Sequence, residues 1–251
     1  MSELLATVVL FAILLSAFLL GIRLRVLIPE HHLSPDSRDT VKLAMGLVAT
    51  MTAILLGLLV SSAKGAYETD RNDIVQMAAK VDFLDRTLAL YGSEAAETRA
   101  GLRDLVAEAM HGMWPDHDAL PVQLTPDARA GNAVYAAIHR LSPRDDMQRD
   151  LKAQALALTV ELEELRTLLL FQAVPSISTP MLIAVTCWLV IIFVGFTLLA
   201  PPNGTTTTAL IAAIASVAGA MFLILELDRP LEGFVRISSA PMLSVLSHLA
   251  K

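Results

Sequence analysis

The residues whose types could do chemistry are concentrated in one short polar stretch, where Glu30, His31 and His32 are followed by Asp36 and Asp39. Imidazole nitrogens and carboxylates can bind zinc, and both groups can carry protons. Adjacent histidines point in different directions, however, and the stretch offers no partner that would orient either ring. The pattern therefore favours an interfacial polar loop that caps the following helix over a metal or proton site.

A second group, His111, Asp116, His117 and Asp118, surrounds Trp114-Pro115 in a predicted loop, and its composition is typical of solvated surface. The sequence holds no glycine-rich phosphate loop, no GxSxG turn and no HExxH helix. Its predicted membrane spans contain no ionisable residue, whereas proton-coupled carriers usually place such residues inside their helices. The sequence thus predicts no enzyme, no catalytic residue, no metal ligand and no cofactor.

The polar stretch leads into a hydrophobic helix. Ser34-Pro35 predicts the start of this helix, because serine can accept an unpaired backbone N–H and proline is tolerated at the first helical position. From Leu43 to Ala63 the chain has 21 residues without a charge. At 1.5 Å per residue they cover the roughly 30 Å hydrocarbon core of a bilayer, so this segment is a predicted span.

Small residues recur at spacings of three or four along this span and therefore share one side of the helix. They are Gly46, Thr50, Ala53, Gly57 and Ser61. Leu55 is expected to face outward. In lipid, such a side usually lets neighbouring helices approach closely. The same side could instead line a pore, because it offers hydroxyls and little bulk. The sequence leaves both interpretations open.

Composition separates membrane segments from a polar middle. Of 251 residues, 55% are apolar and 18% charged, and the net charge of −6 argues against a nucleic-acid surface. Charge-free stretches predict four spans, near 4–21, 43–63, 181–199 and 206–225. Between the second and third, apolar residues repeat at helical spacing, and Ser142-Pro143 predicts a further helix start. The predicted fold is all-α: a polytopic membrane protein with four transmembrane helices and a helical soluble domain between the second and third.

The predicted domains follow from these stretches. Residues 1–64 form the first pair of membrane helices and 65–175 the soluble domain, while 176–227 form the second pair and 228–251 a polar tail. Lysines and arginines are more numerous beside the middle domain than beside the loop between the first two spans. The positive-inside rule then predicts that the middle domain and both termini are cytoplasmic.

Three stretches, PEHHLSPDSRDTVKLAMGLVATM, LDRTLALYGSEAAETR and ELDRPLEGFVRISSAPM, resemble the bacterial bestrophin-like membrane family, a domain of unknown function. The polar residues associated with this resemblance are Glu30, His31, His32, Asp36, Arg38, Asp39, Lys64, Glu226, Asp228 and Arg229. The resemblance implies a distant grouping with pentameric anion channels whose pore is lined by the second membrane helix.

Two functions follow as hypotheses. The first is a homo-oligomeric ion channel in the lipid bilayer that conducts inorganic ions along the small side of the second helix. The second is a non-conducting membrane scaffold or sensor whose helical domain binds a protein partner. If the small residues pack fully against the third and fourth helices, the scaffold is favoured. If a continuous water-filled path runs along the small residues, the channel is favoured.

Overall fold

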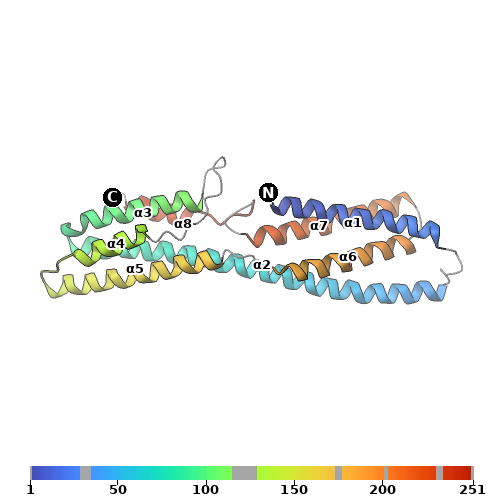
Figure 1. Cartoon of the computed structure of the whole chain (residues 1–251), viewed down its shortest axis with the longest axis horizontal. Helices are drawn as coiled ribbons and strands as arrows, with labels where there is room; N and C mark the ends of the chain where they lie inside the picture. The colour runs from blue at the N-terminus through green and yellow to red at the C-terminus, as the bar shows by residue number, and fades with distance from the viewer. Residues whose placement is uncertain are drawn as a thin grey trace. The chain divides into compact units, whose positions relative to one another are not determined.

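A computed structural model describes residues 2–28, 35–114, 129–172, 177–200, 203–229 and 234–249 of the chain. Within these ranges every regular element is helical, which confirms the predicted all-α class (Figure 1). The α-helices are α1 (Ser2–Leu27), α2 (Pro35–Tyr91), α3 (Ala96–Met113), α4 (Arg129–Arg140), α5 (Asp146–Gln172), α6 (Thr179–Leu199), α7 (Gly204–Leu227) and α8 (Ala240–Leu249). A 3₁₀ turn, η2 (Ser93–Ala95), precedes α3.

Four of these helices, α1, α2, α6 and α7, are long and apolar enough to cross a membrane. The four predicted spans are thereby confirmed in number and position. The helix α2 is much longer than a span, since it continues for 57 residues until Gly92 ends it at φ 121°. Glycine adopts this φ without the steric cost that other residues would meet.

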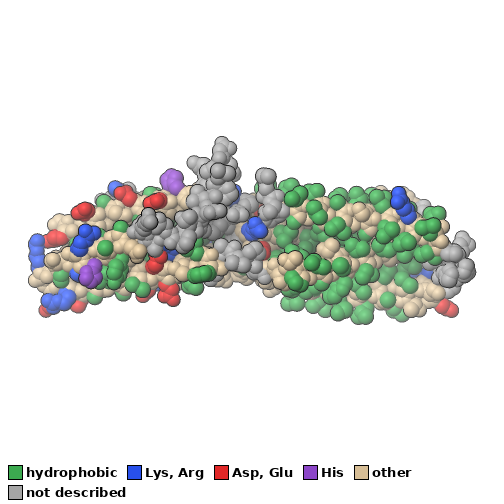
Figure 2. Space-filling view, in the orientation of Figure 1, with side chains coloured by type: hydrophobic (Ala, Val, Ile, Leu, Met, Phe, Trp, Pro, Cys, Tyr) green, Lys and Arg blue, Asp and Glu red, His purple; other side chains and the backbone are tan. Residues whose placement is uncertain are grey.

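The chain divides into two compact units. Unit 1 comprises Met1–Tyr67 and Pro175–Val235, and unit 2 comprises Glu68–Val174 and Arg236–Lys251. The helix α2 therefore contributes its first part to unit 1 and its second part to unit 2. Hydrophobic side chains cover the surface of α1, α6 and α7, whereas charged ones are spread over α3, α4 and α5 (Figure 2). The predicted domain boundaries, including a separate soluble insertion, stay a prediction.

In unit 1, α1 packs against both α6 and α7. The core is apolar and draws residues from all four long helices: Leu14 and Phe18 of α1, Leu59 and Ala63 of α2, Leu189 and Phe193 of α6, and Ile214 and Met221 of α7. The remaining sides of these helices carry many exposed large hydrophobic residues. The exposed sides are those available to lipid or to other chains.

In unit 2, α3 packs against α4 and α8, and α4 packs against α5. The helix α8 lies inside the predicted polar tail, yet its Met242 and Val245 side chains are buried. The Trp114 indole N–H donates to the Ile237 carbonyl at 2.8 Å, which joins the end of α3 to the segment before α8. The C-terminal segment is therefore an integral part of unit 2.

The start of α5 differs from the sequence prediction. The helix begins at Asp146, not behind Ser142-Pro143. The Asp145 carboxylate accepts the Gln148 backbone N–H at 2.7 Å, and the Gln148 side chain accepts the Arg144 backbone N–H at 2.8 Å. Asp145 therefore caps the first turn of α5, and the helix starts behind Asp145 instead of behind Ser142.

Candidate functional site on the second helix

None of the described residues covers the small side of α2. Gly46, Thr50, Ala53, Gly57 and Ser61 are all exposed. A Cβ built on Gly46 or on Gly57 would meet no neighbouring atom within 4 Å. Among the described residues, the packing of this side against the third and fourth membrane helices, which would have favoured the scaffold hypothesis, is therefore not seen within one chain.

The opposite side of α2 is the one that packs inside unit 1. Met45, Thr52, Leu59 and Ala63 are buried there. A Cβ on Gly195 of α6 would collide with the Met45 side chain, so the absence of a side chain at position 195 lets the two helices approach. This contact fixes the rotation of α2 about its axis and turns Gly46, the next residue, outward.

A third side of α2 carries bulky apolar residues that are also exposed, namely Leu47, Ile54 and Leu58. Leu55 was predicted to lie outward, and this prediction is wrong, because Leu55 is partly buried against the core of unit 1. It lies three residues after Thr52 and four before Leu59, so helical geometry places it with these inward residues. Leu58, with 57% of its surface exposed, is the bulky outward residue next to Gly57.

Two hydroxyls lie on the small side. The Thr50 hydroxyl donates to the Gly46 carbonyl at 2.9 Å, within its own helix. That bond uses its hydrogen but leaves lone pairs on the oxygen, since a hydroxyl can donate once and accept twice. Ser61 is exposed one turn after Gly57. The small side therefore offers polar oxygen atoms near both ends of an otherwise apolar segment.

Charged residues continue the same helical register beyond the apolar segment. Asp36, Arg38, Asp39, Lys42 and Lys64 are all exposed. The Lys42 ammonium contacts the Asp39 carboxylate at 2.8 Å. Asp39, Lys42 and Gly46 follow one another at spacings of three and four residues, and Lys64 lies three residues after Ser61. At these spacings the charged residues share the side of the small residues.

The polar residues of the ELDRP stretch lie at the end of α7. Glu226 is 2% exposed, and its carboxylate accepts the backbone N–H of Phe234 at 2.6 Å and of Val235 at 3.4 Å. The Asp228 carboxylate accepts the Ile177 N–H at 3.5 Å, and Arg229 is half-buried. These contacts tie the chain before α6 and the chain after α7 to the same helix end, which is a structural role.

The predicted histidine loop is outside the described residues. Glu30, His31 and His32 all fall in the range 29–34, so the structure does not test the choice between a capping loop and a metal or proton site. Among the residues that are described, no group of three or more histidine, cysteine or acidic side chains could hold a metal ion.

Sequence reasoning missed an ion pair that closes the turn between α2 and α3. The Arg99 guanidinium donates to both carboxylate oxygens of Asp85, at 2.6 and 2.8 Å. The bond to Asp85 is the main reason that the pKa of Arg99 is raised. The sequence did contain a signal for this ion pair, because the oppositely charged Asp85 and Arg99 lie on either side of Gly92, which breaks the helix. A pattern of spacing alone could not show that the two helices fold back on each other.

Comparisons with known proteins bear on this arrangement. A family model described as Bestrophin-like domain matches residues 7–242, which is nearly the whole chain. The search of curated proteins and the search of solved structures returned no match. The match covers α1 from Thr7 onward and the whole of α2, α6 and α7, including the uncovered side of α2.

Proposed function

The chain belongs to the Bestrophin-like family, and on that premise we propose that this membrane protein is a homo-oligomeric anion channel in which the α2 helices of several copies surround a central pore. The expectation of conduction comes from the family. The choice of α2 as the lining helix rests on this chain's own residues.

One observation carries the proposal: the uncovered small side of α2, from Gly46 to Ser61. An ion needs a path that is polar or wide enough to keep part of its water shell. Glycine and alanine leave space for water, and Thr50 and Ser61 supply oxygen atoms to hold it. The bulky outward side, with Leu47, Ile54 and Leu58, is suited to lipid or to the neighbouring copy instead.

The charges at the ends of this side would act on ions that approach the pore. Arg38, Lys42 and Lys64 attract anions to the two mouths, whereas Asp36 and Asp39 oppose them. Asp39 is paired with Lys42, and Arg38 and Asp36 carry opposite charges, so these four residues bring no net charge to the first mouth. We expect a weak preference for anions that falls as ionic strength rises.

The same proposal includes location and orientation. The protein resides in the bacterial inner membrane, with the lipid bilayer against its outward apolar helices and with inorganic ions as its cargo. Unit 2 and both termini face the cytoplasm, as expected from the excess of lysines and arginines on that side.

The test measures both the ionic current and the oligomeric state of the protein. Purified protein in planar bilayers should pass current under a chloride gradient, and native mass spectrometry should give one closed oligomer. Gly57→Phe should remove the current and keep the oligomer, because Gly57 faces open space. Leu58→Phe is the matched control on the neighbouring outward side and should conduct. No current under any voltage, or an oligomer lost in Gly57→Phe but kept in Leu58→Phe, would support the non-conducting scaffold or sensor instead.

A further inference from the structure

Two helices of unit 2 carry large apolar side chains that stay exposed. On α2 they include Val75, Phe83 and Leu90, and on α5 they include Val160 and Leu168. Phe83 has 48% and Val160 57% of its surface exposed. Neighbours within each set are seven or eight residues apart, which is about two helical turns, so each set shares one side of its helix. Apolar residues that gather on one exposed side are typical of an interaction surface.

Two contacts fix how α2 and α5 run beside each other within unit 2. The Lys80 ammonium donates to the Glu161 carboxylate, and the Gln148 side-chain amide donates to the Tyr91 carbonyl at 2.9 Å. The two helices are therefore antiparallel, and positions whose residue numbers add up to about 240 lie at the same level. This register gives the position of α5 that is level with any position of α2.

The exposed charges on these two helices have opposite signs. From residue 71 to 91 of α2 the exposed charged residues are Arg71 and Arg86, whereas from 153 to 171 of α5 they are Glu161 and Glu164. Arg86 and Glu161 each have an ion-pair partner within unit 2. Arg71 and Glu164 make no ion pair within the described part of the chain. The α2 side therefore repels a second α2 side and attracts an α5 side, so a second copy of this chain fits it by charge.

A closed ring of copies in one bilayer relates its members by rotation about the membrane normal, and this axis runs along the membrane-crossing α2. Such a rotation keeps each residue at the same level in every copy, so the levels found within one chain also hold between neighbours. Phe83 is level with position 157 of α5, and Val160 lies three residues further, or about 4.5 Å at 1.5 Å per residue. Arg71 and Glu164 differ in level by five residues, or about 7.5 Å, which two long charged side chains can span.

We propose that the exposed side of α2 in unit 2 docks on the exposed side of α5 in the next copy of the ring. Phe83 packs against Val160 of the neighbouring copy, which removes apolar surface from water on both helices. Arg71 pairs with Glu164 of the neighbouring copy at the edge of this contact. The inference rests on the proposed function for the homo-oligomer alone, and it does not require that the ring conducts ions.

Disulfide trapping between two differently tagged full-length chains tests this docking. In a Cys187→Ala background, one chain carries Phe83→Cys, the other carries Val160→Cys, and both are expressed together. Neither chain can form a disulfide within itself, because each has a single cysteine. Mild oxidation in the membrane should therefore give a covalent dimer that carries both tags.

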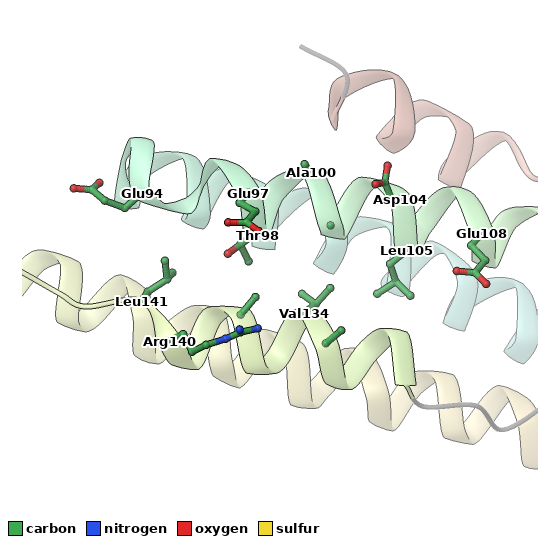
Figure 3. A pocket seen from close by; sticks show the side chains of 13 residues that line it. Glu94, Glu97, Thr98, Ala100, Asp104, Leu105, Glu108, Val134, Arg140 and Leu141 are labelled. Carbon is green, nitrogen blue, oxygen red and sulfur yellow. The ribbon is translucent and has the colours of Figure 1, made fainter.

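Asp104→Cys in place of Val160→Cys is the matched control. The Asp104 side chain is 77% exposed on α3 and points away from α4 (Figure 3). The Asp85–Arg99 pair places Asp104 level with position 80 of α2, which is also the level of Val160. The control should give almost no dimer with both tags, because α3 is not part of the proposed contact.

A charge exchange tests the ion pair separately. Arg71→Glu in the chain with Phe83→Cys should lower the yield of this dimer about threefold or more, because two carboxylates then meet across the contact. Glu164→Arg in the chain with Val160→Cys should restore the yield. The same Glu164→Arg placed in the Arg71→Glu chain should not restore it, since it then lies in a different contact between α2 and α5.

The inference is overturned if Phe83→Cys and Val160→Cys give no dimer with both tags, or if Asp104→Cys gives as much of it. It is equally overturned if the charge exchange fails to restore the yield, or if Phe83→Cys is trapped instead on a second Phe83→Cys chain or on a different protein. A dimer with both tags but no current would remove conduction and keep the docking. A closed oligomer that conducts but gives no such dimer would remove the docking alone.

Discussion

Gly21 of α1 lies directly against Thr197 of α6: a Cβ built on Gly21 would be 2.7 Å from the Thr197 Cβ and 3.1 Å from the Val194 carbonyl oxygen. The contact joins the first and third apolar helices of unit 1 at close range. Close helix contacts of this kind depend on small residues, since in lipid the packing itself supplies much of the attraction. Gly46 and Gly57 on the small side of α2 make no such contact with the described residues, so this side is open where the Gly21 side of α1 is packed.

Gly21→Ala should destabilise unit 1 by about 1–3 kcal/mol, because the new methyl meets a β-branched side chain and a backbone oxygen that cannot move aside. Thermal unfolding in detergent measures the change. Gly219→Ala is the matched control, since a Cβ on Gly219 of α7 meets nothing within 4 Å. Equal melting temperatures for the two variants would show that the Gly21 contact is not as tight as described.

Breaking the Asp85–Arg99 pair should loosen the junction of α2 and α3. Asp85 is buried, and its carboxylate receives two hydrogen bonds from the guanidinium. Arg99→Met leaves that carboxylate without them and should cost about 1–3 kcal/mol. Arg86→Met removes the more exposed pair with Asp82 and should cost less than about 1 kcal/mol. Urea unfolding of both variants tests the order, and a larger loss in Arg86→Met would contradict it.

Stability should depend on pH through Asp70, which lies in unit 2 beyond the charge-free segment of α2. Burial, with a smaller contribution from Asp73, raises the pKa of Asp70 to about 6 from 3.8. Because the pKa of Asp70 is higher in the folded protein than in the unfolded chain, the folded protein binds this proton more tightly. The contribution of the protonated Asp70 to folding stability is therefore fully present below about pH 4 and is lost as pH rises through 6. Asp70→Asn should therefore raise the melting temperature more at pH 7.5 than at pH 4.

Asp73→Asn gives an independent check, because removing its charge should lower the pKa of Asp70 and shift the wild-type transition to lower pH. A melting temperature of Asp70→Asn that exceeds that of the wild type by the same amount at both pH values would assign the effect to packing and not to titration.

The orientation predicts that reporters fused at Gly92 and at the C-terminus both report the cytoplasm. Gly92 suits a reporter because it ends α2 in unit 2. A fusion after Asn203, between α6 and α7, is the control and should report the opposite side. Phosphatase and fluorescent reporters give the two signals, and exchanged signals at all three positions would reverse the proposed topology.

The sequence was sufficient for the four apolar helices, and Gly92, the glycine that ends α2, is a local signal of the same kind. Charge-free stretches of about 20 residues and a helix-breaking glycine are local signals that need no knowledge of packing. The start of α5 was missed, because Asp145 and Gln148 cap the helix together and the serine-proline signal gave no sign of that competition.

Contacts between distant segments could not be predicted. Nothing local pairs Asp85 with Arg99 or Trp114 with Ile237, since those bonds depend on how the helices fold back. The side of α2 that faces inward depends in the same way on its contact with Gly195 of α6. For that reason the small residues were identified from spacing, whereas Leu55 was assigned to the wrong side.

The most direct measurement of the central claim is current block by thiol modification from water. In a Cys187→Ala background, which removes the one native cysteine, Ala53→Cys, Gly57→Cys and Leu58→Cys are reconstituted and treated with a charged, membrane-impermeant methanethiosulfonate. We predict that reagent reduces the current of Ala53→Cys and Gly57→Cys and leaves Leu58→Cys unchanged. A block of Leu58→Cys with no effect at Ala53 and Gly57 would contradict a pore lined by the small side of α2.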